Sequence, residues 1–360
     1  MRASTIIIVI LALSGTQAFG FGYHDAITNG TVLGGFSPYT IALGTVRAVG
    51  ASEPASIFTN PAQIAMHQFT VQLSGSSISW AERVIESDID KTVRTLMTNS
   101  NGLAAVVYPA GGITIGAGVV KVAEFGYEGM HIIFDDPGAP EVGLALLESS
   151  GSQVEAMGSV STVISGPLSA GFSGGVRRAA AEYQYNYASF LFSVPDSSNA
   201  WSKEKSEFAW HAGLALNGDL FKSGISYSSE TEYMENILAF GGSAYAEHLK
   251  KTTVGFEAEI TSPFDQNLFL GKLFLSMPLT KSLEALISVS FDDNRVANRA
   301  GFGFGMGFSG RVGRFILGGG VLNRFRARMD TAFPDEASDR VDDSYTIINL
   351  GVSYSPGDLL

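Results

Sequence analysis

The chain has 360 residues, contains no cysteine and carries a formal net charge of −12. Without cysteine the protein forms no disulfide bond and performs no thiol chemistry. The negative net charge gives no electrostatic basis for binding a nucleic acid, so no nucleic-acid partner is expected.

The first residues have the pattern of a secretory signal peptide. Arg2 supplies a positive charge ahead of an apolar run, Ile6 to Leu13, which is too short to span a bilayer. Small residues favour cleavage after Ala18 or, alternatively, after Gly20. We therefore predict that residues 1–20 are a signal peptide and that the mature protein is exported.

Residues 21–67 stand between the signal peptide and the alternating segments, and within them Ile41–Met66 does not alternate between apolar and polar positions. Their second half, Ile41–Met66, begins with small residues and continues with two proline-led turns. Asn60 suits a helix N-cap and Pro61 the first helical position, where the missing N–H would be unpaired anyway. A compact, small-residue segment of this kind fits inside a larger structure.

The same stretch, ALG…A…EPASIFTNPAQIA, resembles the N-terminal signature of the long-chain fatty acid transporter family (FadL/TodX-like) and is similar to the related PorV/PorQ-like outer-membrane proteins. Gln63 stands where the family usually has glycine, and Thr45 stands where a second glycine is common. The resemblance implies that residues 21–67 form a hatch in the lumen of a barrel of about 14 strands. It also implies that the hatch motif consists of Asn60, Pro61 and Ala62.

Residues 68–355 alternate as membrane-spanning strands do. From Gly301 to Ser309 the odd positions are glycine or serine, and the even positions are Phe302, Phe304, Met306 and Phe308. A period of two puts the large apolar groups on one face, and a transmembrane barrel shows lipid only every second residue. We therefore predict an all-β protein, a transmembrane antiparallel β-barrel whose glycine face leaves room for the hatch.

Thirteen strands can be counted, and an even number is expected, so at least one is missed. The missing strand should lie in 129–147 or 231–246. A phase change between Leu73 and Ile78 suggests a bulge near Gly75. The expected strands are 68–80, 101–108, 112–126, 152–165, 168–182, 206–217, 219–229, 250–261, 266–277, 282–292, 300–309, 314–325 and 344–355.

Connections alternate between short turns rich in Gly, Pro, Asn and Asp and long loops, the habit of barrels with short periplasmic turns and long external loops. Long loops are expected at 83–100, 127–151, 183–206, 230–250 and 326–343. Tyr354 stands near the end of the last strand, and Pro356 should stop it. Residues 356–360 are thus expected to be a tail.

The sequence contains no constellation typical of an enzyme. The five histidines are far apart and lack metal-ligand spacing, and the glycine-rich stretches lie in strands rather than ahead of helices. We therefore predict no enzyme activity, no catalytic residue, no metal site and no cofactor.

Several polar groups remain open to two interpretations. Charged residues opposite the apolar faces either line a solvated pore or guide a ligand and fix the hatch by ion pairs. Acidic residues in the long loops are either solvated or bind divalent cations. The aromatic residues from Tyr183 to Phe192 form either an interfacial girdle or a landing site for an apolar ligand. The lumen candidates are Glu155, Arg177, Glu207, His211, Lys222, Glu257, Glu259, Glu284 and Asp292; the acidic ones are Asp135, Asp136, Asp335, Glu336, Asp339, Asp342 and Asp343.

Two functions follow for a protein of the outer membrane of a Gram-negative-type bacterium, in contact with its lipid. One is passive transport of hydrophobic, fatty-acid-like molecules, with an apolar pocket expected near residues 41–66. The alternative is a PorV/PorQ-like barrel that binds a protein partner of the secretion machinery. The ligand-binding residues are unknown from the sequence.

Overall fold

The computed structural model describes residues 31–32, 34–50, 52–65, 68–86, 89–134, 141–191, 195–246, 252–263, 268–294, 299–330 and 339–356. The predicted signal peptide lies outside the described residues, as do four of the five residues of the predicted tail. Asp135, Asp136, Asp335 and Glu336 also lie outside them. None of the described helices is both long enough and apolar enough to cross a membrane.

The described chain is almost entirely strand. Its three short helices are α3 (Pro38–Ala42), η1 (Pro54–Phe58) and η2 (Pro61–Ile64). The strands are β1 (Thr31–Val32), β2 (Thr70–Glu86), β3 (Ile89–Ala110), β4 (Ile113–Glu124), β5 (Tyr127–Phe134), β6 (Glu141–Ser165), β7 (Leu168–Ser189), β8 (Ser197–Asn217), β9 (Phe221–Ser228), β10 (Ile237–Ala246), β11 (Thr252–Thr261), β12 (Leu268–Pro278), β13 (Leu283–Asn294), β14 (Arg299–Val312), β15 (Phe315–Asp330) and β16 (Asp339–Tyr354).

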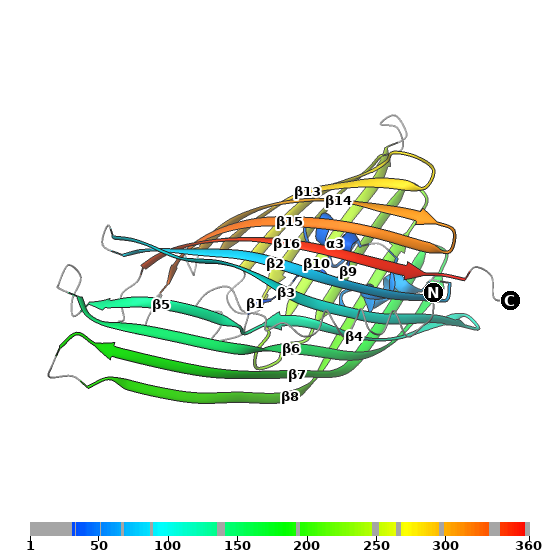
Figure 1. Ribbon diagram of the computed structural model, residues 1–360. Helices are drawn as coiled ribbons and strands as arrows, with labels where there is room; N and C mark the ends of the chain where they lie inside the picture. Colours follow the sequence, from blue (N-terminus) through cyan, green and yellow to red (C-terminus); the bar gives the residue numbers. More distant parts are fainter. Residues whose placement is uncertain are drawn as a thin grey trace.

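Fourteen of these strands close into an antiparallel barrel (Figure 1). Each of β2–β4 and β6–β16 pairs with both neighbours, and the β4–β6 pairing closes the ring. The predicted transmembrane barrel of about 14 strands is confirmed. The missed strand is β10, within the region 231–246 that the sequence pointed to, and β1 and β5 lie outside the ring.

Most residues of the predicted long loops are strand instead. Only residues 87–88 separate β2 from β3, and β7 remains paired with β6 and β8 well beyond Val176. On β7 the outward side chains change from apolar at Val176 to polar at Arg178 and Glu182, while the backbone pairing continues. Apolar side chains alternate only where a strand faces lipid, whereas backbone hydrogen bonding continues beyond the lipid. The alternating pattern in the sequence therefore stops before the strands end.

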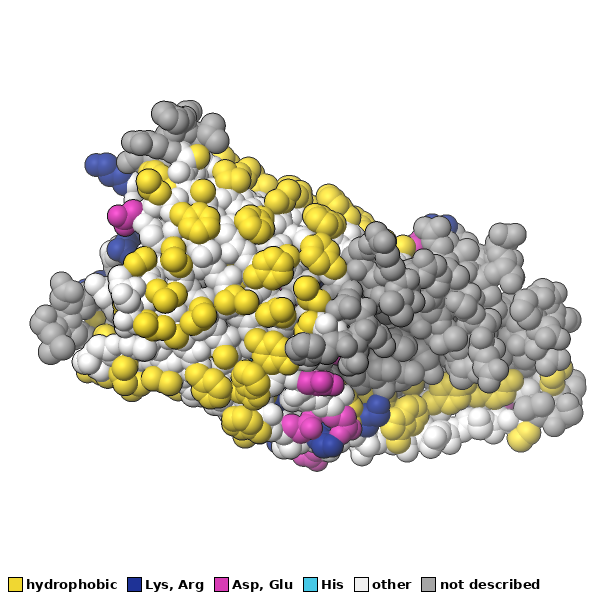
Figure 2. Space-filling view, turned by 180° about the vertical axis from the view of Figure 1, so that it is seen from behind, with side chains coloured by type: hydrophobic (Ala, Val, Ile, Leu, Met, Phe, Trp, Pro, Cys, Tyr) yellow, Lys and Arg dark blue, Asp and Glu magenta, His cyan; other side chains and the backbone are white. Residues whose placement is uncertain are grey.

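Alternation separates the outer from the inner face of the barrel. Phe302, Phe304, Met306 and Phe308 on β14 are exposed on the outside. Figure 2 shows hydrophobic side chains spread over the wall on the opposite side of the barrel. Such an apolar exterior is what a bilayer requires of a membrane barrel. The glycines between them face inward, where they allow close contact with the segment inside.

The bulge predicted near Gly75 exists, but the extra residue is in the partner strand. Gly75 pairs with Gly102, and Ser76 pairs with Ser100, so Asn101 of β3 is left over. The alternation of β2 itself is unbroken. Ile78 and Trp80 are apolar residues that point inward and are buried, which is why the sequence suggested a phase change.

Gly320→Ala tests whether the segment inside the barrel needs the inward-facing glycines in order to pack against the wall. A Cβ at Gly320 would stand 2.3 Å from the carbonyl oxygen of Pro38. We expect the barrel to assemble normally and α3 to be displaced, at a cost of about 1–3 kcal/mol. Limited proteolysis of the folded protein should then cut near α3, with unchanged heat-modifiable gel mobility. Gly158→Ala is the matched control, because a Cβ there meets nothing nearer than 3.9 Å; equal protease resistance in both variants would contradict the prediction.

Candidate functional site

Residues 34–50 and 52–65, here called the inner segment, lie within the ring of strands, where α3 is visible in Figure 1. Each of its short helices begins at a proline, which suits the first helical turn. The Ser37 hydroxyl caps α3 by accepting a hydrogen bond from the Thr40 N–H at 3.1 Å. Ile41, Leu43 and Ile57 are fully buried. Local signals thus start the helices, and the barrel wall buries them.

Asn60 lies at the N-cap of η2 and is completely buried. Its side-chain oxygen accepts a bond from the Ala62 N–H at 3.2 Å, and its nitrogen donates to the carbonyls of Ala48 at 2.9 Å and of Leu214 at 3.2 Å. A Cβ at Gly213 of β8 would stand 2.0 Å from the Asn60 oxygen. Asn60 therefore joins two parts of the inner segment to the wall.

Glu257 of β11 binds the inner segment through three backbone amides. Its carboxylate accepts bonds from the N–H groups of Arg47 at 2.7 Å, Ala48 at 2.7 Å and Val49 at 3.1 Å. Hydrogen bonds to an ionised acceptor are about twice as strong as neutral ones. One wall carboxylate thus holds three consecutive residues of the inner segment.

Lys272 of β12 completes this anchor. Its ammonium donates to the Thr45 carbonyl at 2.7 Å and to the carboxylates of Glu257 at 3.0 Å and Glu259 at 2.8 Å. Arg47 lies 3.4 Å from Glu259, so two cations face two carboxylates in a buried, neutral cluster. The sequence pointed to the two glutamates as lumen residues but missed Lys272 and Arg47. Alternation along β12 could have found Lys272, whereas nothing local marks Arg47.

A second buried cluster joins β6, β7 and β8. The Arg177 Nε donates to Glu155 at 2.6 Å, and the His211 Nε2 lies 3.2 Å from the other oxygen of the same carboxylate. His211 also lies 2.8 Å from the Ser228 hydroxyl. The structure thus brings three predicted lumen residues together.

The other predicted lumen residues are placed separately. Asp292 lies 3.3 Å from Arg324, and Lys222 and Glu284 line a cavity. Glu207 accepts a hydrogen bond from a loop at the opposite end of the barrel. The ion-pair interpretation therefore applies to the Glu257 and Glu259 cluster.

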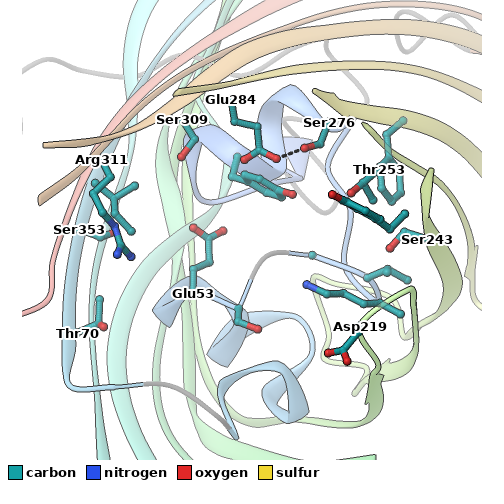
Figure 3. Close-up of a pocket in the computed structure, with 18 of the residues that line it drawn as sticks. Glu53, Thr70, Asp219, Ser243, Thr253, Ser276, Glu284, Ser309, Arg311 and Ser353 are labelled. Carbon is teal, nitrogen blue, oxygen red and sulfur yellow. Dashed lines mark hydrogen bonds between the residues drawn. The ribbon is translucent and has the colours of Figure 1, made fainter. Parts of the chain in front are cut away.

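The cavity opens at the end of the barrel where the short turns lie, beside residues 49–50 and 52–54 (Figure 3). It has a volume of about 630 Å³. Its lining combines apolar side chains with charged ones, among them Glu53, Lys222, Glu284 and Arg311. This is not the apolar pocket expected near residues 41–66. The short-turn end is instead a vestibule that carries charged side chains.

Glu53 connects this vestibule to both the inner segment and the wall. Its carboxylate accepts a bond from the Ser37 hydroxyl and another from the Gln72 amide of β2 at 2.8 Å. Gln72 in turn accepts a bond from the Ala55 N–H at 2.8 Å. Burial raises the pKa of the Glu53 carboxyl from 4.5 to about 7, against the lowering effect of these hydrogen bonds.

An apolar cluster lines the lumen on the other side of the inner segment, toward the long loops. It unites residues from β2, β5, β6, β15 and β16 with one residue of α3. Alternation along each strand does not reveal this cluster, because its members belong to the inward-facing half of strands that are far apart in the sequence. Its members are Ile41, Ile78, Trp80, Tyr127, Leu147, Leu322, Tyr345 and Ile347, with Tyr185 packed against them.

Two arginines of β15 adjoin this cluster at Tyr345. Arg324 lies 3.3 Å from the Tyr345 hydroxyl, and the Arg326 guanidinium lies 5.7 Å from the Tyr345 ring. Asp343 pairs with Arg326 at 3.2 Å. Among the described residues, the buried Nε of Arg324 has no hydrogen-bond partner. Apolar and cationic groups therefore meet on one side of the lumen.

The tyrosines at the end of β7 do not form a lipid-facing girdle. Tyr183 is buried on the inner side, with its ring stacked 5.0 Å from that of Trp201, and Tyr185 packs on the apolar cluster. Phe190 is exposed, and Phe192 lies outside the described residues. The girdle interpretation is wrong for Tyr183 and Tyr185.

The wall is interrupted between β3 and β5. β3 pairs with β4 only from Leu103 to Ala110, while β6 continues from β4 onto β5. Within the described strands, no ladder joins β5 to the part of β3 that precedes Leu103. β1 pairs with Ala123 and Glu124 at the point where the two edges separate. The barrel therefore has a break in its wall on the long-loop side.

No group of three or more His, Asp or Glu residues suited to a metal ion occurs in the part of the chain that the structure describes. Among the acidic loop residues considered for cations, Asp343 pairs with Arg326.

Solved structures of known proteins share this architecture. A FadL homologue of Pseudomonas aeruginosa matches with a TM-score of 0.65 at 10% identity, over 91% of this chain and 99% of that one. The CymD monoaromatic hydrocarbon channel has a TM-score of 0.61 at 10% identity over 90% and 98%, and the P. putida toluene transporter TodX 0.60 at 11% over 89% and 98%. This chain has the FadL/TodX-like fold. No family model and no curated protein sequence matches the chain.

Glu257→Gln should loosen the anchor of the FadL-like barrel on its inner segment. Glutamine keeps the shape but loses the charge that binds three amides, and it leaves Lys272 with one carboxylate fewer, so we expect a cost of about 3 kcal/mol. Hydrogen exchange at the amides of residues 47–49 should accelerate while the barrel strands stay protected. Glu204→Gln, at an exposed pair, is the control and should change neither. Unchanged exchange at residues 47–49 would show that Glu257 is not the anchor.

Acidification should strengthen the inner segment through Glu53. Because the folded pKa of about 7 exceeds the ordinary 4.5, the folded state holds a proton that the unfolded chain has lost between these values. The stabilisation is complete below the lower value and disappears as the pH rises through the higher one. Protection factors around Glu53, corrected for intrinsic exchange, should therefore fall between about pH 5 and pH 8. Glu53→Gln should remove this slope, and a slope that persists in the variant would assign it to another group.

Proposed function

We propose that this protein is an outer-membrane channel for passive uptake of hydrophobic small molecules of the fatty-acid type. One observation carries the proposal: the buried apolar cluster around Tyr127 and Tyr345 adjoins the guanidinium groups of Arg324 and Arg326. An amphipathic acid needs this pair of environments, one for its chain and one for its carboxylate. Arginine suits a carboxylate because its N–H groups form a planar fork.

The names of the similar structures support transport of apolar compounds as a class. CymD is described as a monoaromatic hydrocarbon channel and TodX as a toluene transporter. Those proteins carry neutral substrates by name, so the carboxylate part of the proposal rests on Arg324. Its buried Nε without a partner is a donor that a ligand carboxylate would satisfy.

Within this proposal residues 21–67 act as the hatch, with Asn60, Pro61 and Ala62 as its motif, residues 68–355 form the barrel, and residues 1–20 and 356–360 are the signal peptide and tail. The anchors at Glu257 and Asn60 support a hatch that stays attached to the wall. A substrate held above such a hatch leaves sideways through the break between β3 and β5. The protein works as a channel without catalysis.

Uptake in cells tests the channel. A Gram-negative host lacking its own fatty acid channel should take up radiolabelled oleate in a saturable manner when it expresses this protein. Binding to phospholipid vesicles is a poor substitute, because fatty acids enter a bilayer unaided. If cells that contain the correctly assembled protein take up oleate no faster than cells without it, the proposal is overturned. Recovery of secretion proteins in a pull-down would then favour the PorV/PorQ-like alternative.

The double variant Arg324→Gln with Asp292→Asn tests the substrate class. It removes one guanidinium together with its partner carboxylate and so leaves no buried unpaired charge. We expect the Kd for oleate to rise about tenfold, equivalent to 1.4 kcal/mol, with no change for methyl oleate. Both Kd values are measured with purified protein in detergent. An equal loss for acid and ester would mean that Arg324 acts on structure and not on the carboxylate.

A further inference from the structure

We propose that the loop Ser229–Asn236, here called the strap, closes the lumen at its long-loop end and must lift before substrate enters. The strap joins β9 to β10. This inference rests on the proposed transport function and adds an outer gate to it.

The strap crosses the lumen instead of rising from the rim. Its Thr231 hydroxyl accepts a bond from Arg177 of β7 at 2.8 Å, and its Tyr233 carbonyl accepts one from Gln153 of β6 at 2.9 Å. The Tyr233 ring meets the ring of Phe125, at the junction of β4 and β5, edge-on at 6.0 Å. In the ring order β6 and β4 stand three and four places from β9. A loop that reaches them from β9 therefore passes over the lumen along this side of the barrel.

The middle of the strap is a closed turn that reaches down to the inner segment. Thr231 and Met234 exchange backbone hydrogen bonds at 2.8 and 3.2 Å. Met234 is buried in the same apolar cluster as Phe36, Ile57 and Phe58 of the inner segment. The strap therefore covers the outer side of the inner segment with an apolar side chain.

Exposed polar contacts hold the strap to β8. Glu232 forms an ion pair with Lys205, both about 45% exposed, and its N–H donates to Glu207 at 2.8 Å. The Lys203 ammonium lies 5.8 Å from the Tyr233 ring. Ion pairs exposed to solvent contribute little to stability, because water screens them and the long side chains lose freedom. The contacts at the rim are thus weak enough to open and close.

The two ends of the strap are fixed to the ring. The Ser229 N–H donates to the Trp210 carbonyl at 2.9 Å, and the Asn236 carbonyl accepts a bond from the Ser262 N–H at 2.9 Å. The Asn236 side chain also donates to the Tyr227 hydroxyl at 3.0 Å. With both ends held and the middle attached by side chains, the strap can swing as a unit.

Cross-linking tests the gate directly because the chain has no cysteine. Lys205→Cys with Glu232→Cys places two thiols on the strap and β8, to be joined by a short, reducible bis-methanethiosulfonate reagent. Arg178→Cys with Glu204→Cys is the matched control. It also replaces an exposed ion pair, but it joins β7 to β8, which already pair along their length. Oleate uptake is measured in the host described above, before cross-linking, after it, and after reduction.

We expect the cross-linked strap variant to fall to the uptake of cells without the protein and to recover on reduction. The uncross-linked variant should transport at least as fast as the wild type, since a contact that closes the gate has been removed. The control pair should transport equally in all three states. Equal uptake with the strap cross-linked and free would overturn the gate and leave the channel intact. Absence of uptake in the wild type would instead overturn the proposed function itself.

Discussion

The closure of the backbone hydrogen-bond ring is the constraint on which the rest of this structure depends. A strand surrounded by lipid cannot leave its N–H and C=O groups unpaired, because each one would cost several kcal/mol. The fourteen strands satisfy this by pairing around the full ring, with β4 and β6 closing it. Among the described strands, pairing lapses only toward the long-loop side, where β3 and β5 share no ladder and where β8 has no ladder to β9 before His211.

Closure of the ring also determines which residue types suit each face of a strand. Large apolar side chains on the outside meet lipid, and small residues on the inside leave room for a folded segment. The inner segment fills that room and needs polar attachments, because its backbone amides are no longer in water. Glu257 supplies three of these at once, and Lys272 neutralises the carboxylates that do so. A buried ion cluster of this kind costs desolvation, which only close pairing offsets.

The two ends of the lumen differ in chemistry. The vestibule beside Glu53 carries several charged side chains, while the cluster around Tyr127 and Tyr345 is apolar. A molecule entering from the long-loop side would pass from apolar surroundings toward polar ones, with the inner segment between them. The break in the wall, the strap and the arginines of β15 all lie on the apolar side of this division.

The sequence by itself determined the class of the protein. Alternation at Gly301–Ser309 required a barrel wall, and Asn60-Pro61 required a capped helical turn, because both signals are local and depend on neighbours along the chain. The sequence pattern underestimated the length of the strands, since outward residues such as Arg178 are polar beyond the lipid while the backbone pairing continues. Only the tertiary structure joined Arg47 to Glu259, collected Trp80, Tyr127 and Tyr345 into one cluster, and left β5 without a ladder to β3. These contacts connect residues far apart in the chain. Their formation depends on ring order and register, and no local pattern carries either one.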